Sequence, residues 1–90
     1  MRKEFKKILA KELRFLAIET RERLALTQKE MGERLQMSES SYSDIERGRY
    51  TCSVLTASLL LNMQEDPRRF LHGVEGKFNE YYLKEMQPTC

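Results

Sequence analysis

The sequence predicts an all-α protein, a compact bundle of about five helices. Apolar residues recur at steps of three and four positions along most of the chain, which is the spacing of an amphipathic helix. Signals for β-strands are scarce, because β-branched residues are rare and an alternation with a period of two is missing. Helix-capping residues also stand in front of most of the predicted segments.

The length and composition fit one globular domain. A chain of 90 residues, 40% hydrophobic and 33% charged, is expected to form a single core, so residues 1–90 are predicted to be one domain. No apolar run approaches the ~20 residues of a transmembrane helix, and the charges near the N-terminus leave no room for a signal peptide. These features predict a cytoplasmic protein without a membrane segment.

The cysteines and the single histidine exclude several kinds of site. Cys52 and Cys90 do not form a disulfide framework and are expected to be free thiols, with a reactive or inter-subunit Cys90 as the alternative. The lone His72 has no zinc-ligand spacing to any cysteine, so neither a metal nor a cofactor is expected. The chain also lacks a nucleophile–base arrangement, which makes an enzyme the weakest class of function.

The first two helices are marked by periodicity and by a capping box. A long helix is predicted over residues 3–24. Its apolar face is formed by Phe5, Ile8, Leu9, Leu13, Leu16, Ala17, Thr20 and Leu24. Thr27 and Glu30 then have the spacing of a capping box, which predicts a short second helix over residues 28–35.

Two further helices are predicted from their caps. Ser38 is the expected N-cap of a third helix over residues 39–47, and Gly48 is expected to end it in a left-handed conformation. A fourth helix is capped by Thr51 or Ser53. It would bury Val54, Leu55, Ala57, Leu59 and Leu61.

The C-terminal part of the chain is predicted to be a helical extension over about residues 67–86. Asp66 and Pro67 combine a capping carboxylate with a proline at the first helical position. Gly73 and Gly76 leave open whether the extension is one helix or two. A stripe at helical spacing can cover the core or form the interface of a homodimer, and it consists of Phe70, Leu71, Val74, Phe78, Tyr81, Tyr82 and Met86.

The spacing within residues 28–47 predicts a central helix-turn-helix. An eight-residue helix, a three-residue turn and a second capped helix follow one another there. Gly32 supplies the small residue that is needed where the two helices approach most closely. The apolar positions that hold the two helices together are Met31, Leu35, Tyr42 and Ile45. The second helix of such a motif can enter a DNA major groove.

The stretch from Leu26 to Gly48 resembles the lambda-repressor/Cro-like (XRE-type) family of DNA-binding proteins. The similarity rests on Leu26-Thr27-Gln28 at the start and Ile45-Glu46-Arg47-Gly48 at the end, and with flanking helices it extends over about residues 13–63. The resemblance implies a five-helix bundle that binds double-stranded DNA, usually as a dimer. It also implies a bacterial or phage regulator that is associated with the nucleoid when bound.

The resemblance assigns roles to individual residues. Base readout in the major groove is implied for Glu39, Ser40, Ser43 and Asp44. Contacts to DNA phosphates are implied for Gln28, Lys29, Ser41, Arg47, Arg49 and Tyr50. Gln28 would also brace the start of the reading helix. Arg21 and Glu46 match a structural ion pair between the first and third helices.

Three residues depart from the family pattern. Gln36 replaces the glycine of the turn and is expected to adopt a left-handed conformation, which costs about 1 kcal/mol. Tyr42 replaces an aliphatic core residue, so its hydroxyl needs a hydrogen-bond partner or access to the surface. Cys52 lies near a position where many relatives have proline.

The net charge of +2 is unevenly distributed. Residues 1–26 contain eight basic and four acidic side chains, a net +4, whereas residues 27–53 and 54–90 each carry −1. The basic residues near the N-terminus can contact phosphates as an arm or helix end, or form a solvated face. They are Arg2, Lys3, Lys6, Lys7 and Lys11.

Two functions are consistent with these residues. The first is a sequence-specific, repressor-like transcriptional regulator that reads the major groove with residues 39–47. The second is a protein-interaction or antitoxin-like module on the same fold, with little or no DNA binding. Glu39 and Asp44 favour the second because carboxylates in the groove meet phosphate repulsion, although an acid near a helix N-terminus is also ordinary helix chemistry.

Overall fold

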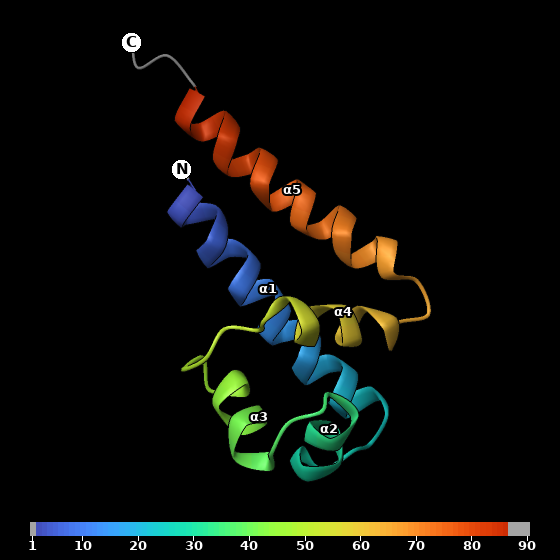
Figure 1. Cartoon of the computed structure of the whole chain (residues 1–90). Helices are drawn as coiled ribbons and strands as arrows, with labels where there is room; N and C mark the ends of the chain where they lie inside the picture. Colours follow the sequence, from blue (N-terminus) through green and yellow to red (C-terminus); the bar gives the residue numbers. More distant parts are fainter. Residues whose placement is uncertain (1, 87–90) are drawn as a thin grey trace.

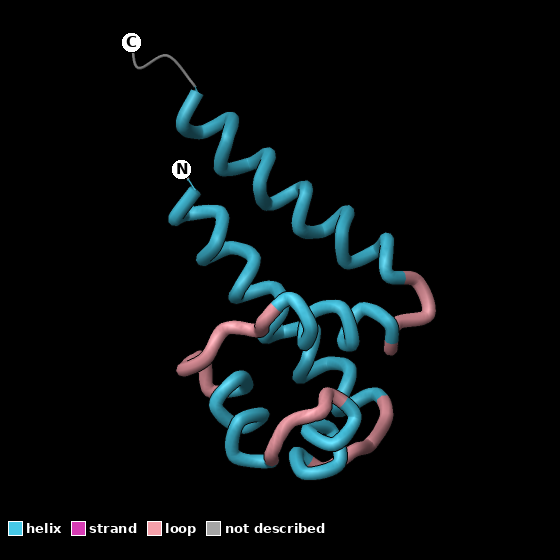
Figure 2. Tube along the Cα trace, viewed as in Figure 1, coloured by secondary structure: helices cyan, strands magenta, loops and turns pink. Residues whose placement is uncertain are grey.

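The computed structural model describes residues 2–86 as five α-helices, with no strand in this range (Figures 1 and 2). The helices are α1 (Arg2–Arg23), α2 (Gln28–Arg34), α3 (Glu39–Glu46), α4 (Val54–Asn62) and α5 (Pro67–Met86). The predicted all-α fold class is confirmed, and α5 is one helix that continues through Gly73 and Gly76. Within residues 2–86, no helix has both the length and the apolar character needed to span a membrane.

Two parts of the molecule can be distinguished in Figure 1. α2, α3, α4 and the C-terminal half of α1 form a globule, and the N-terminal half of α1 runs out of it beside α5. α1 and α5 run in opposite directions, so the first turn of α1 and the last turn of α5 lie at the same end. This helix pair gives the molecule its elongated outline of 52 × 26 × 19 Å.

The core lies where α1, α2, α3 and α4 meet. Its buried cluster consists of Leu13, Ala17, Met31, Leu35, Tyr42 and Leu60. The four residues predicted to hold α2 against α3 are all buried, since Met31, Leu35, Tyr42 and Ile45 are each exposed by 2% or less. Burying a large apolar side chain contributes about 1.5–3 kcal/mol, so these contacts fix the orientation of α3 from the inside.

The helices begin at the predicted capping residues. Thr27 and Glu30 form the complete capping box of α2: the Glu30 N–H donates to Thr27 Oγ1 at 3.1 Å, and the Thr27 N–H donates to Glu30 Oε1 at 2.9 Å. Ser38 caps α3. Of the two candidates for α4, Ser53 and not Thr51 is the N-cap. These caps pair backbone N–H groups that the helices leave unsatisfied. The burial predicted for Val54 and Leu55 is wrong: they stand in the first turn of α4 and are exposed by 86% and 63%, whereas Leu60 is buried.

Aromatic side chains join the outer ends of α1 and α5. The Phe5 ring centroid lies 4.8 Å from that of Phe78, 5.5 Å from that of Tyr81 and 6.4 Å from that of Tyr82. Ring pairs at such distances are worth about 0.5–1.5 kcal/mol beyond the area that they bury. This aromatic cluster therefore holds the two helices together beyond the globule.

The C-terminal stripe is used mainly within the chain. Phe70 packs against the core cluster and Val74 is buried. Leu71, Tyr82 and Leu83 remain exposed by 50%, 45% and 65%. The structure does not describe the side chain of Met86, the last residue of the stripe. Cys90 lies outside the described residues altogether.

Candidate nucleic-acid interface

The turn between α2 and α3 depends on Gly32. A Cβ atom built on this residue would lie 3.0 Å from the backbone oxygen of Met37 and 3.1 Å from that of Ser38. The Met37 N–H donates to the Gly32 carbonyl oxygen at 2.9 Å and closes the turn over the same glycine. A side chain at this position would therefore push the start of α3 away from α2, which is the close approach that the sequence predicts.

Three residues near the motif have a positive φ. Gln36 has φ 61°, the left-handed conformation predicted for it, and Gly48 ends α3 with φ 76°, also as predicted. Ala25, between α1 and α2, has φ 53°, which the sequence analysis did not foresee. A non-glycine residue in this region costs about 1–2 kcal/mol, so Ala25 and Gln36 are sites of local strain.

Glu46, the last residue of α3, pairs with Arg21 of α1. Arg21 Nε donates to Glu46 Oε2 at 2.6 Å and Arg21 Nη2 donates to Glu46 Oε1 at 3.2 Å. The two side chains are exposed by 22% and 10%. This bidentate geometry is the strong form of an arginine–carboxylate contact, and it is the ion pair that the family resemblance implies.

Two further side chains donate to the same carboxylate. The Tyr42 hydroxyl donates to Glu46 Oε2 and thereby has the partner that its burial requires. Gln28 Nε2 donates to Glu46 Oε1 at 3.0 Å. We refer to Arg21, Gln28, Tyr42 and Glu46 as the Glu46 cluster. It links α1, α2 and both turns of α3.

Gln28 lines the hollow beside the start of α3, but the hydrogen bond of its side chain is made to the end of that helix. Its side chain reaches the last residue of that helix, Glu46, and not the first. The physical reason is that a carboxylate is a stronger acceptor than a neutral group, while the start of α3 already has its cap in Ser38. The carbonyl oxygen of the Gln28 side chain is left for another donor.

The charges of the Glu46 cluster support one another. Burial alone would raise the pKa of Glu46, but the hydrogen bonds from Arg21, Tyr42 and Gln28 outweigh it and lower that pKa. The hydrogen bond to Glu46 raises the pKa of Arg21. Burial, and then the bond to Glu46, raises the pKa of Tyr42. At neutral pH the cluster therefore holds a carboxylate, a guanidinium and a neutral phenol.

Arg14 also connects α1 to the end of α3, and it was missed in the sequence analysis. Its Nε donates to the backbone carbonyl of Glu46 at 2.6 Å. The signal was available, because Arg14 and Arg21 are seven positions apart and so lie on one face of α1. With the Glu46 cluster, Arg14 fixes α3 relative to the long first helix.

The four residues assigned to base readout lie together on the outer side of α3. Glu39, Ser40, Ser43 and Asp44 surround one shallow hollow, with Gln28 and Arg47 at its edge. Within residues 2–86, no hydrogen bond or ion pair engages the side chains of these four residues. The hollow is thus lined by polar groups that are available to a ligand.

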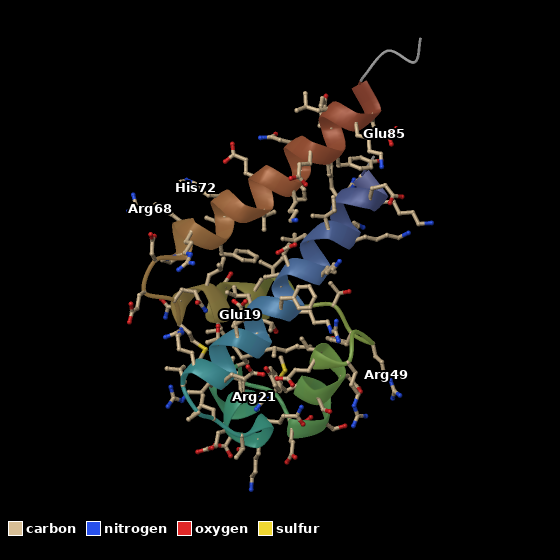
Figure 3. The ribbon with its side chains drawn as sticks, turned by 180° about the vertical axis from the view of Figure 1, so that it is seen from behind. Glu19, Arg21, Arg49, Arg68, His72 and Glu85 are labelled. Carbon is tan, nitrogen blue, oxygen red and sulfur yellow. The ribbon has the colours of Figure 1, made fainter. Side chains whose placement is uncertain are left out.

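Of the residues assigned to phosphate contacts, Gln28 and Arg47 line this hollow, and the others lie on α2, on α3 and in the segment after α3. Arg47, Arg49 and Tyr50 are exposed in the segment that follows α3, and Arg49 projects away from the helices (Figure 3). Lys29 is exposed in the first turn of α2. Ser41 is exposed in the first turn of α3, where its Oγ accepts from the Ser38 hydroxyl at 3.0 Å and keeps its own hydrogen to donate.

Comparison with known proteins identifies this arrangement. Residues 9–63 match a protein-family model described as a helix-turn-helix domain, and they include all of α2, α3 and α4. Neither the curated proteins nor the solved structures give a significant match to the chain.

Proposed function

The chain belongs to the helix-turn-helix domain family, and from this premise we propose that it is a sequence-specific DNA-binding transcriptional regulator of the repressor type. Membership of this family indicates DNA binding. Regulation would follow from occupation of an operator, with α3 in the major groove. The observation that carries the proposal is the outer side of α3, where four unengaged polar side chains surround one hollow.

The chemistry of these side chains suits the edges of bases. Ser40 and Ser43 can each donate or accept a hydrogen bond, and the carboxylates of Glu39 and Asp44 can accept one from the N4 amino group of cytosine. Arg47, at the edge of the hollow, would contact a phosphate and fix the register. Each well-placed base contact is worth about 1–3 kcal/mol of discrimination.

Selection of bound duplexes from a random pool tests this function. The wild-type chain is expected to enrich one sequence, and the variants E39Q, S40A, S43A and D44N are expected to change individual positions of it. Ser58→Ala, at an exposed position of α4, is the matched control and should leave the consensus unchanged. A consensus that survives all four changes would show that these residues do not read the bases.

A second candidate function is a protein-interaction or antitoxin-like module. The two carboxylates on the outer side of α3 favour it, because they repel phosphate and would attract a basic protein surface. A gel shift at low salt separates the two functions. Enrichment of a duplex supports the regulator, whereas the absence of any retardation supports the protein partner.

We also propose that the regulator acts as a homodimer through α5. Leu71 belongs to the C-terminal stripe, is 50% exposed and lies outside the aromatic cluster that joins α5 to α1. Sedimentation should show a dimer that Leu71→Glu converts to a monomer. Leu83→Glu is the control, since Leu83 is also exposed, by 65%, but lies on another face of the helix. A monomeric wild type at high concentration would refute the proposal.

A further inference from the structure

Basic residues of α1 lie on one face of the helix. Lys3, Lys7, Lys11 and Arg14 follow one another at steps of four, four and three positions, which places them in one line along the helix. We call these four residues the α1 basic stripe. Lys7, Lys11 and Arg14 line a hollow together with parts of the loop that follows α3, namely Gly48, Tyr50, Thr51 and Cys52. The stripe therefore borders the candidate DNA interface.

The carboxylates of α1 point to other parts of the molecule. Glu12 and Glu19 line a separate groove, which α1 forms with the loop between α4 and α5 and with the start of α5. Glu4 lies near Tyr81 of α5: burial, and then the charges of Glu85 and Glu4, raise the pKa of that tyrosine. Three of the four acids of α1, namely Glu4, Glu12 and Glu19, thus lie near α5 or the loop before it, whereas Lys7, Lys11 and Arg14 lie beside the loop after α3.

The loop after α3 lies between the α1 basic stripe and the hollow on α3, and it carries basic residues of its own. Arg47 lies at the edge of that hollow, and Arg49 follows it and projects into solvent (Figure 3). Arg14, which donates to the last carbonyl of α3, lies beside Gly48, with its Nε 3.6 Å from the position that a Cβ would occupy. Positive charges therefore run from the end of α3 along the loop to the middle of α1.

We propose that the α1 basic stripe is a second DNA-contacting surface that binds the phosphate backbone of the duplex beside the segment facing α3. The inference rests on the proposed function. It accounts for the charge distribution, since residues 1–26 carry +4 while residues 27–53, which contain α3, carry −1. From Lys3 to Lys11 the helix extends over about 12 Å. Duplex DNA presents one negative charge per about 1.7 Å, so several phosphates face such a length.

The salt dependence of duplex binding tests the stripe. K7Q/K11Q is the test variant, and K77Q/K84Q, which removes two exposed lysines from α5, is the matched control. Arg14 is kept because it holds α3. A plot of log K against log[salt] has a negative slope, and each lost phosphate contact makes it less steep by about 0.9. A fourfold rise in salt should therefore weaken wild-type and control binding about tenfold more than K7Q/K11Q binding.

The possible outcomes separate the stripe from the proposed function. Equal slopes for K7Q/K11Q and K77Q/K84Q, with wild-type binding intact, would overturn the stripe alone. A wild-type chain that binds no duplex at low salt would overturn the proposed function and the stripe together. The four substituted lysines are exposed, so circular dichroism melts should give the same Tm for the wild type and both variants. A change in the salt dependence of binding then reports a lost DNA contact and not a change in folding.

Discussion

Among single residues, Glu46 has the widest structural effect. Its carboxylate accepts hydrogen bonds from α1 through Arg21, from α2 through Gln28 and from the preceding turn of α3 through Tyr42. One acid at the end of the candidate reading helix thus orients that helix against two others. A mutation there is expected to displace α3 as a whole, so lost DNA binding in such a variant would report structure and not base contact.

Replacing Glu46 with glutamine should destabilise the protein strongly. The change leaves the Arg21 guanidinium, exposed by only 22%, without its counter-charge. We expect the free energy of unfolding to fall by about 2–4 kcal/mol. Urea denaturation followed by circular dichroism measures it. Glu33→Gln is the control: Glu33 is exposed on α2, so a loss of comparable size there would contradict this reasoning.

The same carboxylate predicts a pH dependence of stability. The folded pKa of Glu46 is below its ordinary value of 4.5. Its contribution is therefore complete above the unfolded pKa and is lost as the pH falls through the folded pKa. The free energy of unfolding should decline below about pH 4.5, and this decline should be shallower in Glu46→Gln. Parallel curves for the two proteins would assign the acid sensitivity to other carboxylates.

Gln36 offers a stabilising substitution. Because its φ is 61°, glycine at this position should raise the free energy of unfolding by about 1 kcal/mol. The urea midpoint should rise without a change in m. Gln36→Ala, which keeps a Cβ, should give no such gain. A gain from alanine equal to that from glycine would show that the left-handed backbone is not the source.

At the scale of elements, the helices were predictable because their signals are local. The capping box of α2, the serine cap of α3 and the Asp66-Pro67 start of α5 each depend on residues a few positions apart. The grouping of residues on the outer side of α3 follows in the same way from helical periodicity. The partner of Gln28, the strain at Ala25 and the role of Arg14 depend on how distant helices pack, which periodicity does not specify.

The glycines of two elements should respond oppositely to alanine. Gly32→Ala forces a Cβ within 3.0 Å of the Met37 oxygen and should destabilise the motif by about 1–3 kcal/mol. Gly73→Ala meets nothing within 4 Å in α5 and should stabilise by about 0.5–1 kcal/mol, because alanine favours the helix. Thermal unfolding of both variants compares the two signs directly. If Gly32→Ala leaves the free energy of unfolding unchanged, the turn can shift to accommodate the added Cβ atom.

At the scale of the whole molecule, the long helix pair carries the charge asymmetry. Glu12 and Glu19 of α1 lie toward the start of α5, whereas Lys7, Lys11 and Arg14 lie toward the loop after α3. The sequence indicates the excess of bases, but only the packing of α1 separates them from the acids. Arg49 lies on the opposite side of the molecule from Arg68 and His72 of α5 (Figure 3). A duplex bound at the loop would thus lie on the side of the molecule away from Arg68 and His72.

The outer end of the helix pair should open without loss of the helix-turn-helix. Phe5→Ala removes the ring that contacts Phe78, Tyr81 and Tyr82, and should cost about 1–2 kcal/mol. Hydrogen exchange should accelerate in the last turns of α5 but not in α3. Phe15→Ala is the control, since that ring is 41% exposed and lies outside the aromatic cluster. Faster exchange throughout both helices and α3 would show one cooperative unit instead.

The buried phenol at the centre of the motif gives the protein an internal optical probe. The chain has four tyrosines and no tryptophan, so its near-ultraviolet absorbance above 280 nm comes mainly from phenols. Tyr42 is fully buried and resists ionisation, whereas Tyr50 is 58% exposed. In an alkaline titration, Tyr42 should therefore ionise, and change its ultraviolet absorbance, only when the contact between α1 and α3 opens. Its absorbance reports whether α3 is packed against α1, with no label attached.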